Sequence, residues 1–217
     1  MSAEAKTSVV VIDDHPLFRK GVADLIRMEP SLRLVGEAAD GENGVRVAQD
    51  TDPDLILLDL NMKGWNGIQT LERLRALDLD ARVIVLTVSD SEEDVVAALR
   101  AGADGYLLKD MEPEDILASL RRATQGRVVI SERLTELLAH ALREDPRPRR
   151  PEQAGLTPRE EQILGHIAKG YSNKLIARDL DLTVGTVKVH VKHILKKLGL
   201  KTRVEAAVWA INSQARG

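Results

Sequence analysis

Residues 9–14, Val9-Val10-Val11-Ile12-Asp13-Asp14, and residues 55–59, Leu55-Ile56-Leu57-Leu58-Asp59, share one pattern in which four apolar residues lead into aspartate. Two further apolar runs also lead into a polar residue. They are Val83-Ile84-Val85-Leu86 before Thr87 and Tyr106-Leu107-Leu108 before Lys109. Short continuous apolar runs separated by helical stretches are typical of buried parallel strands. The pattern therefore predicts an α/β fold.

The residues that follow these strands are the first indication of function. Ligands of open parallel sheets bind outside the carboxyl ends of the strands, so we expect five polar side chains to meet there: Asp13, Asp14, Asp59, Thr87 and Lys109. Crowded carboxylates repel one another, and a divalent cation such as Mg²⁺ relieves that repulsion. Aspartate also ends strands simply because it caps the next helix. Five such residues together instead favour a site where one aspartate accepts a phosphoryl group.

The chain divides into two expected domains joined by a linker. Residues 8–127 are predicted to form a doubly wound (βα)₅ parallel sheet, with the second strand near Leu32–Glu37 and helices near 15–28, 41–51, 66–77, 91–101 and 112–125. Residues 128–154 are expected to be a linker, because an amphipathic leucine helix capped by Ser131 precedes three closely spaced prolines without apolar neighbours. Residues 155–217 are expected to form a separate all-α domain.

The second domain has clear helix signals. A capping box begins at Thr157 and another at Thr202, while Thr183 begins a longer helix that Gly199 ends. The expected buried stripe of that longer helix is Val184, Val187, Val191, Ile194, Leu195 and Leu198. The last helix is expected to bury Val204, Ala207, Val208 and Ile211. A short helix near 173–180 and a tight turn precede the longer helix, which is the layout of a helix-turn-helix.

Composition limits the class of protein. The 217 residues contain no cysteine, which excludes disulfides and thiolate chemistry. The polar first residues are unlike a signal peptide, and no apolar run approaches the roughly 18 residues of a membrane span, so a cytoplasmic protein without membrane contact is expected. Residues 1–145 carry a net charge of −11 and residues 146–217 one of +8. The basic second half favours a polyanionic partner.

The predicted longer helix leaves a basic face outside its buried stripe. Lysines on a helix are commonly just solvated, but Val189 among them has no core to join and could meet a thymine methyl group. Lys188 and Lys192 could reach guanine edges or phosphates. The remaining candidate DNA contacts are Lys196 on the same helix, with Lys174, Arg178 and Lys201 as expected backbone contacts. Only five aromatic residues are present, which favours double-stranded DNA over single strands.

The histidines do not suggest a site of their own. The five histidines are scattered over different expected elements and lack the spacing of metal ligands. They are His15, His140, His166, His190 and His193. No Ser-His-Asp set is apparent either. We therefore expect no histidine ligand and no hydrolase triad.

Residues 8–126 resemble the receiver domain of bacterial two-component response regulators, through Val11–Pro16, Leu58–Met62 and Leu107–Lys109. The resemblance implies Asp59 as the phosphoacceptor. It implies Mg²⁺, or another divalent cation, held by Asp14, Asp59 and the backbone carbonyl of Asn61, with Asp13 acting through water. Lys109 would contact phosphoryl oxygens, and Thr87 and Tyr106 would be the switch pair. One departure is Asp110, where many receivers have proline after the lysine.

Residues 155–217 resemble the tetrahelical DNA-binding domain of the NarL/LuxR class, through Leu156–Glu160 and Thr186–Val191. The similarity narrows to nitrate/nitrite response regulators at Leu108–Asp115, Lys192–Leu198 and Val204–Trp209. The resemblance implies a transcriptional regulator of anaerobic respiration genes that is activated by a sensor histidine kinase. The implied partners are that kinase, double-stranded DNA, a second copy of the chain when phosphorylated or DNA-bound, and RNA polymerase as a further candidate.

Two alternatives remain at the level of sequence. An aspartyl-phosphate phosphatase would need a general acid and a substrate pocket, which the sequence does not indicate, so we expect no enzyme beyond slow hydrolysis of its own phosphoryl group. A regulator that binds DNA independently of phosphorylation could use the first domain only to dimerise. Receivers of that kind are expected to lack some of the five polar residues, and this chain has all five.

Overall fold

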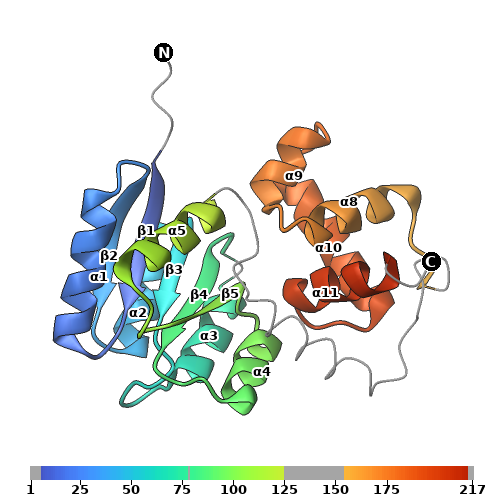
Figure 1. Cartoon of the computed structure of the whole chain (residues 1–217). Helices are drawn as coiled ribbons and strands as arrows, with labels where there is room; N and C mark the ends of the chain where they lie inside the picture. Colours follow the sequence, from blue (N-terminus) through green and yellow to red (C-terminus); the bar gives the residue numbers. More distant parts are fainter. Residues whose placement is uncertain (1–5, 78, 125–153, 215–217) are drawn as a thin grey trace. The chain divides into compact units, whose positions relative to one another are not determined.

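The computed structural model describes residues 6–77, 79–124 and 154–214, which belong to two compact units divided after Thr124 (Figure 1). The predicted linker helix and the proline-rich tether lie outside the described residues.

The first unit contains a five-stranded parallel sheet. Its strands are β1 (Thr7–Ile12), β2 (Leu32–Ala38), β3 (Leu55–Leu58), β4 (Arg82–Thr87) and β5 (Gly105–Leu108). They are arranged in the order β2-β1-β3-β4-β5. The four apolar runs lie within β1, β3, β4 and β5, and the predicted parallel α/β fold is confirmed.

Five helices cover the two faces of this sheet. They are α1 (Pro16–Met28), α2 (Gly41–Thr51), α3 (Gly67–Ala76), α4 (Glu92–Ala101) and α5 (Pro113–Thr124). Helices α1 and α5 contact each other on one face, and α2, α3 and α4 form a row on the other (Figure 1). This is the doubly wound arrangement that the alternating pattern predicts.

Local sequence sets the ends of several helices. Pro16 occupies the first turn of α1, where its missing N–H costs nothing. The side chain of Asn66 accepts a hydrogen bond from Gln69 N–H at the start of α3, and the side chain of Gln69 accepts one from Asn66 N–H. At the end of α4, Gly102 adopts a left-handed conformation with φ 109°.

The core of the first unit is the sheet itself. All four residues of β3 are at most 1% exposed, and Val9–Ile12 of β1 are at most 2% exposed. Burial of each such side chain stabilises the fold by about 1.5–3 kcal/mol. Because both faces of the sheet are covered, β3 and residues Val9–Ile12 of β1 are apolar, and Asp59 and Asp13 follow directly after them.

Between residues 154 and 214, the second unit forms a bundle of four helices, α8 (Pro158–Ala168), α9 (Asn173–Asp179), α10 (Val184–Leu198) and α11 (Arg203–Gln214). The predicted capping box at Thr157 forms with Glu160, and Thr183 caps α10. Gly199 ends α10 in a left-handed conformation with φ 66°. In the stripe predicted for α10, Val187, Ile194 and Leu198 are fully buried. Its other members, Val184, Val191 and Leu195, are partly buried against the same core.

An ion pair joins α10 to the start of α8. Lys197 Nζ lies 2.7 Å from the carboxylate of Glu160, which is 3% exposed. Burial raises the pKa of Glu160, but hydrogen bonds from Lys197 and Thr157 outweigh burial and hold that pKa below its usual value. Lys197 therefore positions α10 within the bundle.

The last helix differs from the prediction in the residues that it buries. Ile211 is 44% exposed, so its assignment to the buried stripe is wrong, and Ala206, Trp209 and Ala210 lie in the core instead. Small alanines allow close packing of α11 against α8, which a pattern of large apolar residues does not reveal. The cap predicted at Thr202 forms, because its hydroxyl oxygen accepts a hydrogen bond from Glu205 N–H at 3.2 Å, while the carboxylate of Glu205 accepts one from Lys201 N–H at 2.8 Å. None of the described helices is long and apolar enough to cross a membrane.

Candidate functional site

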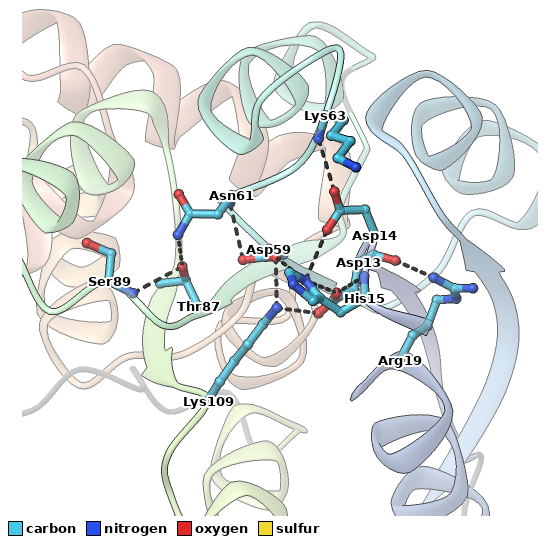
Figure 2. A network of polar contacts seen from close by, with 10 residues as sticks. All are labelled: Asp13, Asp14, His15, Arg19, Asp59, Asn61, Lys63, Thr87, Ser89 and Lys109. Carbon is cyan, nitrogen blue, oxygen red and sulfur yellow. Dashed lines mark hydrogen bonds and ion pairs between the residues drawn. The ribbon is translucent and has the colours of Figure 1, made fainter. Parts of the chain in front are cut away.

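Strand register brings the predicted site residues together. Ile12 pairs with Leu58 across β1 and β3, and Asp59 N–H donates to Ile12 O at 2.9 Å. At the ends of the paired strands β4 and β5, Lys109 N–H donates to Thr87 O at 2.8 Å. Asp13, Asp59, Thr87 and Lys109 therefore leave four strands at the same edge (Figure 2).

The centre of the site is a buried charge cluster. Lys109 Nζ lies 2.7 Å from Asp59 Oδ2 and 2.8 Å from Asp13 Oδ2. The side chains of these three residues are at most 7% exposed. The ring of Phe18, on α1, lies beside the same ammonium, with 4.7 Å between Nζ and the ring centroid. One ammonium thus faces two carboxylates in a setting where charge interactions are strong.

Asp14 completes the acidic group. Its Oδ2 accepts a hydrogen bond from Lys63 N–H at 3.1 Å, while its buried Oδ1 has no hydrogen-bond partner among the described residues. An unsatisfied buried carboxylate oxygen beside two further carboxylates is suited to a divalent cation with oxygen ligands. The geometry therefore fits the cation that the sequence predicts.

The structure also places His15 in this group. Ligand atoms of Asp13, Asp14, His15 and Asp59 all lie within 4.8 Å of one another. The spacing of the histidines along the chain did not indicate that His15 lies in this group. Its position directly after Asp14 at the end of β1 was the available signal, but histidine spacing along the chain does not reveal a group assembled from different strands.

The side chains of the expected switch pair are linked through Ser89. Thr87 Oγ accepts hydrogen bonds from Asn61 Nδ2 at 3.3 Å and from Ser89 N–H at 3.4 Å. The hydroxyl of Tyr106 donates to Ser89 O at 2.8 Å, and its ring is buried. Burial, together with the charge of Asp94, raises the pKa of Tyr106 to about 12, so the phenol remains a hydrogen-bond donor.

Sequence reasoning missed two further contacts with the acidic group and the link through Ser89. The backbone N–H of Lys63 reaches Asp14, and the guanidinium of Arg19 donates to Asp13 O at 2.5 Å. The backbone of Asn61 also contacts the site, since its N–H donates to Asp59 Oδ1 at 3.2 Å. Several of these contacts use backbone atoms, which residue type does not mark.

The helix-turn-helix presents the predicted basic face. On α10, Val189 is 53% exposed, Lys192 and Lys196 are exposed, and Lys188 is partly exposed. On α9, Lys174 and Arg178 are exposed, and so is Lys201 after α10. None of these residues belongs to the buried core of the second unit. Their side chains therefore lie on the surface of the two helices and the following turn.

Each of the two units matches a known protein family. Residues 9–121 match the response regulator receiver domain, and residues 154–210 match the bacterial regulatory proteins of the luxR family. The chain is 56% identical over 209 residues to the nitrate/nitrite response regulator protein NarL of Escherichia coli K12, covering 96% of this chain and 97% of that protein. It is 45% identical to the nitrate/nitrite response regulator protein homolog of Haemophilus influenzae, covering 94% and 95%.

A solved structure covers almost the whole length. The response regulator ChrA of a heme-sensing two-component system matches with a TM-score of 0.51 and 32% identity, covering 98% of each chain. The sheet with its charge cluster, the helix-turn-helix and these matches lead to the same conclusion. The chain belongs to the two-component response regulators that join a receiver domain to a LuxR-type DNA-binding domain.

Proposed function

We propose that phosphorylation of Asp59 switches this regulator and that it controls genes which respond to nitrate and nitrite. The observation that carries the first part is the buried cluster in which Lys109 bridges Asp59 and Asp13. The named functions of the relatives in Escherichia coli and Haemophilus influenzae support the second part. The phosphodonor is a phosphohistidine of a sensor kinase.

Phosphoryl transfer follows from the placement of the charges. A carboxylate oxygen of Asp59 attacks phosphorus, the P–N bond of phosphohistidine breaks, and the electron pair returns to the imidazole nitrogen. Lys109 moves its ammonium from the carboxylates to the new phosphoryl oxygens, which offsets the developing charge.

Asp14, Asp59 and the backbone carbonyl of Asn61 would hold Mg²⁺, with Asp13 contributing through water. The buried Oδ1 of Asp14, which accepts no hydrogen bond within the described residues, supports this set. When bound, the cation neutralises part of the negative charge that the phosphoryl group brings. Slow hydrolysis of the acyl phosphate is the turnover that we expect at this site.

Thr87 would detect the phosphoryl group through its hydroxyl. Both of its hydrogen bonds use the hydroxyl oxygen as acceptor, so the O–H hydrogen is left to be donated to a phosphoryl oxygen. Moving Thr87 toward Asp59 removes the acceptor of Ser89 N–H. The carbonyl of Ser89 holds Tyr106, so the movement reaches the β4–α4 loop and β5.

The second unit binds double-stranded DNA through α10, as a dimer of two chains. Lys188, Val189 and Lys192 read base edges or nearby phosphates in the major groove, and Lys196 extends the same face. Lys174, Arg178 and Lys201 contact the phosphate backbone. The exposure of Val189 supports base reading, because an apolar side chain gains little from water and matches a thymine methyl group. RNA polymerase is the partner through which bound dimers act on transcription.

The test combines labelling with DNA binding. Acetyl phosphate with Mg²⁺ should add one phosphoryl group to the full chain, detected by mass spectrometry, and raise its affinity for cognate DNA. Asp59→Asn should remove both effects, because an amide forms no acyl phosphate, while Asp24→Asn on the surface of α1 is the matched control. Labelling of Asp59→Asn at the wild-type extent would contradict the proposed acceptor.

A reporter gene tests the physiological signal. Nitrate should change expression in cells with the wild-type chain and should have no effect in cells with Asp59→Asn. A response to nitrate that is equal in both would contradict nitrate control through this phosphorylation site.

A further inference from the structure

His15 lies directly beside the carboxylates at the edge of the sheet. Its Nδ1 is 3.1 Å from Asp14 Oδ1, 3.7 Å from Asp13 Oδ1 and 3.9 Å from Asp59 Oδ2 (Figure 2). We propose that His15 supplies a nitrogen ligand to the cation of this site and so shifts its preference from Mg²⁺ toward first-row transition metal ions such as Co²⁺. This inference rests on the cation site of the proposed function.

The distances suit ligands that share one ion. Bonds of roughly 2.1 Å to an octahedral ion place neighbouring ligand atoms about 3 Å apart and opposite ones about 4.2 Å apart. The three separations from His15 Nδ1 fall between these limits. A cation can therefore contact the imidazole nitrogen and carboxylate oxygens with small side-chain adjustments.

The backbone holds His15 in this place. Its N–H donates to Asp13 Oδ1 at 2.8 Å, and it is the extended residue before α1, with φ −88° and ψ 105°. Lys109 contacts the Oδ2 atoms of Asp13 and Asp59, whereas His15 lies nearest to Oδ1 of Asp13 and of Asp14. The oxygens nearest His15 are thus ones that Lys109 does not contact, and Oδ1 of Asp14 has no hydrogen bond within the described residues.

Exposure makes the nitrogen accessible. The side chain of His15 is 67% exposed, so an ion arriving from solvent reaches the imidazole without displacing a packed side chain. Sites made only of oxygen ligands suit Mg²⁺, while imidazole favours the later first-row metals, whose affinities rise from Mn²⁺ through Co²⁺ and Ni²⁺. One nitrogen among three carboxylates should therefore raise the affinity for Co²⁺ far more than that for Mg²⁺.

A second role for His15 makes the opposite prediction. If the imidazole only served as a positive counter-charge to the carboxylates, it would repel every divalent cation. Its removal would then increase the affinity for Co²⁺ and Mg²⁺ together. The ratio of the two affinities separates a ligand from a counter-charge.

The experiment measures binding and not phosphorylation. Co²⁺ is titrated into the full chain and followed by its visible absorption, and Mg²⁺ affinity is obtained from displacement of Co²⁺. His15→Asn should lower the Co²⁺ affinity about tenfold and leave the Mg²⁺ affinity within about twofold. His193→Asn, which removes an exposed imidazole from α10, is the control and should change neither affinity at this site.

Asp14→Ala distinguishes the failures. If it abolishes binding of both ions while His15→Asn changes both affinities equally or changes neither, the carboxylate site stands and the role of His15 is refuted. If Asp14→Ala leaves both affinities unchanged, the cation site of the proposed function is itself wrong, and the inference about His15 fails with it.

Discussion

Lys109 and Asp59 form a buried ion pair between the ends of β5 and β3, with 2.7 Å between Nζ and Oδ2. The same ammonium also contacts Asp13, so the side chain of Lys109 holds the two carboxylates together in the absence of a phosphoryl group. The two functions that follow are separable. Lys109 pairs with both acidic residues in this structure, and we propose that it contacts phosphoryl oxygens in the activated state.

Replacement of Lys109 tests the second function. Lys109→Met should slow labelling by acetyl phosphate by about 10- to 100-fold, because a donor to the developing phosphoryl charge is removed. Lys63→Met is the control, since its backbone and not its side chain provides the hydrogen bond to Asp14. Labelling rates from mass spectrometry decide the matter, and an unchanged rate in Lys109→Met would show that Lys109 has no part in the transfer.

The carboxylate of Asp14 should allow cation binding but lower the stability of the metal-free protein. Without metal its carboxylate lies near those of Asp13 and Asp59, and its Oδ1 accepts no hydrogen bond within the described residues. Asp14→Asn should therefore stabilise the metal-free protein by about 1–2 kcal/mol through reduced repulsion. Addition of Mg²⁺ should raise the melting temperature of the wild type but not of the variant.

The control for Asp14 is a surface aspartate. Asp24 pairs with Arg27 on α1 at 2.8 Å, and both side chains are more than half exposed. Asp24→Asn should change the free energy of unfolding by no more than about 0.5 kcal/mol and preserve the response to Mg²⁺. A destabilised Asp14→Asn would mean that repulsion is not the dominant effect of this carboxylate.

Tyr106 gives a prediction for alkaline pH. Its pKa is about 12 in the folded protein and 10.0 for an unperturbed tyrosine. The unfolded chain thus loses its phenolic proton first, so the stabilisation from this group is complete below pH 10 and declines as pH rises toward 12. Tyr106→Phe should lose less stability than the wild type between about pH 10 and 12 in urea unfolding. Equal slopes in the two proteins would argue against a raised pKa.

The fold could be predicted closely where one physical signal dominates. Leu55–Leu58 is both the predicted run and the observed β3, because a strand buried on both faces must be apolar throughout. Capping residues such as Thr157 and Thr183 act within a few residues, so the sequence contains all that is needed to place those helix starts. Ile211 was assigned wrongly, because the helical period of apolar residues does not show which face of α11 packs against the other helices.

The candidate site was only partly predictable. Asp13, Asp59, Thr87 and Lys109 were found because parallel strands bring their carboxyl ends to one edge. The place of His15 depends on the direction of its ring, and that of Ser89 on its backbone carbonyl, which accepts a hydrogen bond from the hydroxyl of Tyr106. Neither property follows from residue type, so these contacts needed the structure.

Gly67 should be essential for the shape of the site. A Cβ at this position would lie 2.4 Å from Asp59 O and 2.4 Å from Leu60 Cα, which are backbone atoms that cannot rotate away. Gly67→Ala should destabilise the protein by about 2 kcal/mol and impair labelling of Asp59. Gly21→Ala on α1, where a Cβ meets nothing within 4 Å, should instead stabilise by about 0.5–1 kcal/mol in the same urea titration. Wild-type labelling in Gly67→Ala would show that the β3–α3 loop adapts freely.

The two classes of proposed DNA contact should respond differently to substitution. Lys188 and Val189 lie in the first half of α10, where a side chain in the major groove reaches base edges. Lys188→Ala or Val189→Ala should reduce the preference for cognate over unrelated DNA by about 1–3 kcal/mol for each base that is no longer read. Lys201 follows α10, so Lys201→Ala should weaken binding to both DNAs alike and reduce the salt dependence by about one counterion.

Fluorescence anisotropy with cognate and unrelated duplexes at several salt concentrations measures both quantities. Lys169→Ala is the matched control, because Lys169 is an exposed lysine that caps α8 and belongs to neither α9 nor α10. It should leave affinity and preference unchanged. If Lys188→Ala weakens binding to the two duplexes equally, Lys188 contacts only phosphates. The register of α10 in the major groove must then be rotated so that other residues of its exposed face, such as Lys192, meet the bases.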